Sequence, residues 1–161
     1  MKTKPTVRTL LAAAIVGLVV GFAAVTVPAC GGIKTNVSPV ADVANAGGKV
    51  EDYAHVILTS AQYAQTAGII SRQALDDVAL AVNKIGHVGL DLKAALDAYN
   101  AAKAAGSDLA LQRAAVSQAL AALSQALADV GQAVPSGTVS QIDQAAGNIL
   151  GLIAQVKATV L

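Results

Sequence analysis

Apolar residues recur at alternating spacings of three and four along most of the chain after residue 38, and this pattern limits what the chain can fold into. Residues spaced in this way share one face of an α-helix, whereas half-buried strands need a period of two, which no segment shows. The sequence therefore predicts an all-α fold. The four predicted apolar faces consist of Val40, Val43, Gly47, Val50, Ala54, Ile57, Ala61 and Ala64; of Leu75, Val78, Val82, Ile85, Gly89, Leu92, Leu96 and Tyr99; of Val116, Leu120, Leu123, Leu127, Val130 and Val134; and of Val139, Ile142, Ala146, Ile149, Ile153, Val156 and Val160.

The first predicted helix has a start signal and an early weak point. Ser38 is a suitable N-cap, and Pro39 fits the first helical position, where its missing N–H costs nothing. Gly47 and Gly48 each cost about 1 kcal/mol relative to alanine inside a helix. We therefore expect a continuous helix from near Lys49.

Turn signals separate the later helices. Gly68 predicts a Schellman-type end to the first helix, with Ile69 making its apolar contact, and Ser71 predicts the next start. The second apolar face continues for almost four heptads, as in a coiled coil, and Gly86 with Gly89 in its middle predicts either a bend or a close helix crossing.

The remaining signals complete a helical bundle. The glycine, serine and aspartate at 106–108 predict the end of the second helix and the start of the third. Pro135 forbids continuation of the third helix. Thr138 with Gln141 predicts a capping box for the fourth helix. Four helices of similar type joined by short turns predict an antiparallel bundle of about four helices over residues 38–161, behind an N-terminal apolar leader helix.

The first 30 residues have the order of an export signal. Lys2, Lys4 and Arg8 precede an uncharged apolar run over residues 9–27, which small residues follow up to Cys30. Cations before such a run favour keeping the N-terminus in the cytoplasm. We therefore predict an export signal or membrane anchor at 1–30 and a short glycine-containing tether at 31–37.

The segment Val27-Pro28-Ala29-Cys30, followed by Gly31, resembles the lipobox of bacterial lipoproteins. The resemblance implies that export cleaves the chain before Cys30 and that lipid, including palmitate, is attached to this cysteine. Gly31 is not the aspartate that the family associates with retention in the inner membrane, which implies an outer-membrane destination in a two-membrane cell. The resemblance covers only the leader.

Other interpretations of the apolar run stay open. As a helix, residues 9–27 span about 28 Å, which nearly crosses a hydrocarbon core of about 30 Å, so an uncleaved signal anchor also fits. A cleaved secretory leader and a buried helix are further alternatives. Gly17 and Gly21 have the small-xxx-small spacing of packed membrane helices, which suits a single-span membrane-active protein such as a phage holin or lysis accessory.

The residues after the leader predict no catalytic chemistry, cofactor or metal site. His55 and His87 lack further ligands at metal-binding spacing, and no nucleophile has a base at a recognisable spacing. Three of the 11 Lys and Arg residues lie in the leader, so residues 31–161 carry eight cations against 10 acids, and we expect no nucleic-acid partner.

A low charge content indicates instead a protein that works by contact. Only 13% of the chain is charged, against about 25% in ordinary soluble domains. We expect a non-catalytic envelope protein of a bacterium, held by membrane lipid through its N-terminal segment, with its C-terminal domain outside the cytoplasm. Its helix faces are available to a protein partner, and no feature of the sequence specifies an oligomeric state.

Overall fold

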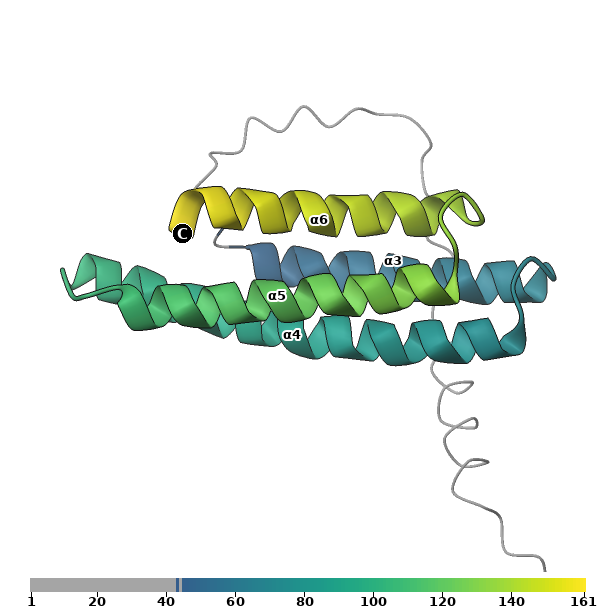
Figure 1. Ribbon diagram of the computed structural model, residues 1–161, viewed down its shortest axis with the longest axis horizontal. Coiled ribbons are helices and arrows are strands. Elements are labelled where there is room, and N and C mark those ends of the chain that lie inside the picture. Colours follow the sequence, from purple (N-terminus) through teal and green to yellow (C-terminus); the bar gives the residue numbers. More distant parts are fainter. Residues whose placement is uncertain (1–42, 44) are drawn as a thin grey trace, which may run out of the picture. The chain divides into compact units, whose positions relative to one another are not determined.

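The computed structural model describes residue 43 and residues 45–161 of the chain, and these residues form helices joined by short turns. The helices are α3 (Ala46–Thr66), α4 (Arg72–Ala104), α5 (Ala110–Ala133) and α6 (Ser140–Val160), as Figure 1 shows. The described part contains no strand, so the predicted all-α bundle of four helices is confirmed. The leader helix and the start at Ser38 and Pro39 lie outside the described residues.

The four helices pack as an antiparallel ring. α3 contacts α4 and α6, and α5 also contacts α4 and α6, whereas the backbones of the diagonal pairs of described helices lie farther apart. Of the four neighbouring pairs, α5 and α6 share the least contact. The turns from α3 to α4 and from α5 to α6 lie at one end, and the turn from α4 to α5 lies at the other, together with the start of α3 and the end of α6 (Figure 1).

The predicted apolar faces form the core. The four faces meet in one cluster, whose largest fully buried side chains include Ile57, Ile85, Leu92, Leu96, Leu120, Leu123 and Ile149. From residue 43 onward, the described residues that were predicted on these faces are all buried except Leu75 and Ala146, which are partly buried and pack against the cluster. No polar or charged residue of the described part is buried. The core is therefore held by apolar packing alone.

The turn between α3 and α4 has the predicted capping at both helix ends. Gly68 adopts a φ of 73°, and the Ile69 N–H donates to the Ala64 carbonyl at 2.8 Å, which is the Schellman arrangement. The Ser71 hydroxyl accepts a hydrogen bond from the Ala74 N–H at 3.1 Å. The predicted apolar contact of Ile69 is wrong, because this side chain is 57% exposed and Ile70 packs against the core in its place.

The capping box predicted before α6 is also wrong. Val139, not Thr138, occupies the N-cap position and makes no side-chain capping bond, and the Thr138 N–H instead donates to the Pro135 carbonyl within the turn. The Asp143 carboxylate accepts from the Gly137 N–H at 2.8 Å. A carboxylate from the first turn of the helix therefore supports the turn in place of a Thr hydroxyl.

The closest approach of two helices is the crossing of α3 and α4 at Gly47 and Gly89. A Cβ atom on Gly47 would lie 2.7 Å from the Lys93 Cβ and 2.8 Å from the Gly89 carbonyl oxygen. The predicted close crossing is thus present at Gly89, whereas a Cβ atom on Gly86 would meet nothing within 4 Å. This contact lies in the first turn of α3, and the helix begins at Ala46, ahead of the expected start near Lys49.

Helix α4 is much longer than its neighbour α3. It has 33 residues, against 21 in α3, and residues 94–104 run past the level of Gly47 by about 16 Å at 1.5 Å per residue. The α4–α5 hairpin therefore projects beyond α3 and α6 (Figure 1). We refer to residues 98–115 as the hairpin tip.

The glycine crossing predicts opposite effects for two alanine substitutions. Gly47→Ala should lower the free energy of unfolding, because overpacking costs roughly 1–3 kcal/mol and the gain in helix propensity recovers at most about 1 kcal/mol. Gly86→Ala, in open space within α4, should raise it by roughly 0.5–1 kcal/mol. Urea unfolding followed by circular dichroism measures both, and equal effects of the two substitutions would contradict the crossing.

Candidate functional site

The predicted lipidation site, Cys30, and the lipobox segment Val27-Pro28-Ala29-Cys30 lie outside the described residues. Their acylation therefore stays a prediction from the sequence. Within the part of the chain that the structure describes, no helix combines the length and the apolar character needed to cross a membrane.

The two histidines lie on different helices and are both exposed. His55 belongs to α3 and His87 to α4. Asp52, one helical turn before His55, is exposed as well. Among residues 43 and 45–161, no group of three or more histidine, cysteine or acidic side chains is arranged to hold a metal ion. The described helices thus bring neither histidine into a ligand cluster.

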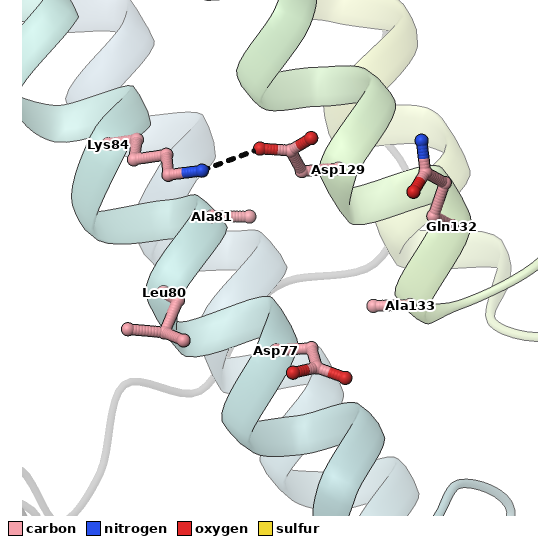
Figure 2. Close-up of a pocket in the computed structure, with 7 residues that line it drawn as sticks. All are labelled: Asp77, Leu80, Ala81, Lys84, Asp129, Gln132 and Ala133. Carbon is pink, nitrogen blue, oxygen red and sulfur yellow. Dashed lines mark hydrogen bonds and ion pairs between the residues drawn. The ribbon is translucent and has the colours of Figure 1, made fainter.

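A polar hollow of about 440 Å³ lies between α4 and α5 and is open to solvent. An ion pair joins its two sides: the Lys84 ammonium donates to an Asp129 carboxylate oxygen at 2.8 Å (Figure 2). The Gln125 amide donates to the other oxygen of Asp129 at 3.4 Å. The residues that line the hollow are Asp77, Leu80, Ala81, Lys84, Asp129, Gln132 and Ala133.

The hydrogen bonds around Asp129 change its acidity. The bond from the Lys84 ammonium, followed by that from the Gln125 amide, holds the pKa of the Asp129 carboxyl below its usual range, against a smaller opposing effect of burial. The Lys84 side chain is 63% exposed, so solvent screens the pair and its contribution to stability is small. The hollow therefore contains a local, solvent-screened link between α4 and α5.

A second, apolar hollow lies where α5 and α6 share little contact. It measures about 270 Å³, and Leu150 at its border is 52% exposed. Gly131 on α5 and Gly147 on α6 both line it, and a Cβ atom on either would meet nothing within 4 Å. The lining residues are Leu127, Val130, Gly131, Val134, Ser136, Ile142, Asp143, Ala146, Gly147 and Leu150.

The sequence pattern predicts neither hollow. The apolar faces of α5 and α6 identify the core residues, but the distance between two helices depends on how all four pack. Gly131 and Gly147 were the sequence signal that could have pointed to the apolar hollow, because each glycine inside a helix costs about 1 kcal/mol relative to alanine and needs a structural reason. In this structure no close helix contact accounts for these two glycines.

Comparison of the chain with models of protein families, with curated proteins and with solved structures found no match.

The Asp129 contacts predict a measurable pKa change. Lys84→Met should raise the Asp129 pKa toward the ordinary carboxyl value, and Gln125→Ala should raise it less, because the Lys84 hydrogen bond contributes most. The stabilisation from this pair should be present above about pH 3.9 and disappear as the pH falls through the lowered pKa. An NMR titration of the Asp129 carboxyl measures this, and an unchanged pKa in Lys84→Met would contradict it.

Exposure of both histidines predicts that neither matters for stability. The double variant His55→Ala, His87→Ala should keep the melting temperature of the parent chain, and added zinc should shift neither protein. Thermal melts followed by circular dichroism, with zinc or with a chelator, measure this. A zinc-dependent melting temperature that either single substitution abolishes would reveal a ligand site.

Proposed function

We propose that this protein is a membrane-anchored protein of a bacterial envelope with a structural or binding role and no catalytic activity. In this proposal Cys30 is the lipid attachment site, and residues after it lie outside the cytoplasm, at the outer membrane of a two-membrane cell. The observation that carries the proposal is the leader, in which three cations, an apolar run and Val27-Pro28-Ala29-Cys30 follow one another.

The helical bundle suits a role that works through contact. Its core contains no buried polar or charged residue among the described residues, and the Gln112 side-chain oxygen near the start of α5 is buried without a hydrogen-bond partner. Its surface instead presents two shallow hollows and several exposed apolar side chains, among them Tyr63, Leu80 and Leu111.

Only a short stretch of chain separates Cys30, the proposed lipid attachment site, from the helical bundle. Residues 31–42 separate Cys30 from Val43, the first described residue, and a fully extended chain spans at most about 47 Å between these two residues. A lipid on Cys30 would thus keep Val43, three residues before the start of α3, within about that distance of the bilayer.

Intact-mass measurement of the protein recovered from membranes tests the proposal. We expect a mature chain that begins at Cys30 and carries the added mass of lipid. Cys30→Ser should leave an unprocessed precursor in the inner membrane, because a serine hydroxyl cannot form the thioether to lipid. Thr35→Ala, a substitution in the predicted tether, serves as the matched control and should be processed normally.

Two results would contradict the proposal. A full-length chain of unmodified mass would instead indicate an uncleaved anchor, as in a single-span membrane-active protein, and lysis on expression would support that alternative. A mature product of unchanged mass and location from Cys30→Ser would show that the cysteine plays no part in anchoring.

A further inference from the structure

The hairpin tip projects from the end of the bundle at which α3 begins. The turn from α4 to α5, the start of α3 and the end of α6 all lie at this end, and the tip extends farther than either α3 or α6 (Figure 1). The chain therefore enters the bundle from its N-terminal residues on the same side as the projecting tip.

The surface of the tip is apolar for an exposed turn. Leu111 is 82% exposed, which is the highest exposure among the large apolar residues of the described part. Leu109 packs only partly against the core, and alanine occupies most of the exposed helical positions around it. The core does not cover Leu111, so this side chain is free to enter an apolar phase that meets the end of the projection.

The tip also carries cations that no carboxylate of the described part neutralises. Lys103 lies 5.9 Å from the centroid of the Tyr99 ring, and neither Lys103 nor Arg113 forms an ion pair with a described residue. The acid of the tip, Asp108, accepts a hydrogen bond from the Ala110 N–H at the start of α5. By contrast, Lys84 and Lys93 each contact an aspartate at 2.8 Å.

Charge is distributed unequally between the two ends of the described bundle. The far end has more acids than cations, whereas the two signs balance at the end that carries the tip. The far end contains Arg72 and Lys84 against Asp76, Asp77, Asp129 and Asp143; the tip end contains Lys49, Lys93, Lys103, Arg113 and Lys157 against Glu51, Asp52, Asp91, Asp97 and Asp108. An anionic surface would therefore repel the far end more strongly than the tip end.

We propose that the hairpin tip docks on the surface of a lipid bilayer, with Leu111 entering the interface and Lys103 and Arg113 contacting anionic headgroups. An exposed apolar side chain on the same hairpin tip as two cations on long stems matches the layered chemistry of that interface. This inference rests on the proposed membrane anchoring, because the short connection to Cys30 is what holds the tip near a bilayer. Docking would make the tip a second point of attachment and fix the orientation of the bundle.

Single tryptophan probes in the full chain test the docking directly, since the natural sequence contains no tryptophan. Leu111→Trp places a probe in the tip, and Tyr63→Trp, at a side chain that is 74% exposed near the opposite end, is its matched control. Each chain, purified from membranes, is reconstituted in vesicles of phosphatidylcholine and phosphatidylglycerol that contain a brominated phosphatidylcholine as quencher. Flotation of the vesicles reports anchoring independently of the fluorescence.

We expect both chains to float, with quenched and blue-shifted fluorescence for Leu111→Trp and neither effect for Tyr63→Trp. Adding Arg113→Glu to Leu111→Trp should reduce the quenching, whereas adding Arg72→Glu at the far end should leave it unchanged. Salt should also weaken the quenching, because screening shortens the reach of charge from about 30 Å at 0.01 M to about 3 Å at 1 M. Circular dichroism verifies that each variant is folded.

Three results would overturn the docking. Chains that float while the two probes are quenched equally, or not at all, would exclude the tip as a contact and leave the anchoring intact. A blue shift of the Leu111→Trp probe that grows with protein concentration without vesicles would assign the tip to a second copy of the chain. Chains that fail to float would refute the anchoring, and the docking with it.

Discussion

Close approach of helices is the constraint on which this structure depends, because the core is built almost entirely from aliphatic side chains and more than half of these are alanine or valine. Tyr99 is the one aromatic residue in the buried cluster of the described part, and alanines such as Ala46, Ala54 and Ala61 occupy many of the other positions. Burying a leucine contributes roughly 1.5–3 kcal/mol, and an alanine contributes much less. Such a core gains enough contact only when the backbones lie close together, and the contact of Gly47 with Lys93 and Gly89 shows the limit of that approach.

The same constraint explains why the four pairs of neighbouring helices differ in how closely they pack. Helices α3 and α4 meet through glycine, and α4 with α5 makes the most extensive contact of the described pairs, supported by Lys84 and Asp129 across the polar hollow. Once these contacts are satisfied, α5 and α6 are left farther apart, and the apolar hollow beside Gly131 and Gly147 remains between them. Helix α4 is also too long for α3 to cover, so its last turns and the first turns of α5 project as the hairpin tip.

The two proposals together describe one arrangement of the protein at a membrane. In it, a lipid on Cys30 would supply the anchor, the short connection would limit how far the bundle can move away, and the projecting tip with Leu111, Lys103 and Arg113 would supply a second contact. The acidic far end, with Asp76, Asp77 and Asp143, would then face away from an anionic bilayer. In this arrangement the low surface charge of the chain has a use, since tethering reduces its dependence on charge for solubility.

Features that depend on neighbours in the chain were determined by the sequence itself. Helical spacing identified the buried faces through Val160, and local capping chemistry at Gly68 and Ser71 was predictable because its partners lie within a few residues. Prediction failed where several local arrangements compete, as at Thr138 and Ile69, and only the assembled turns decided which group makes the contact. The tertiary structure alone decided that Gly89 makes a close crossing while Gly86 does not, that α5 and α6 leave a hollow, and that Leu111 is exposed. Each of these depends on distances between helices, which no spacing along a single helix contains.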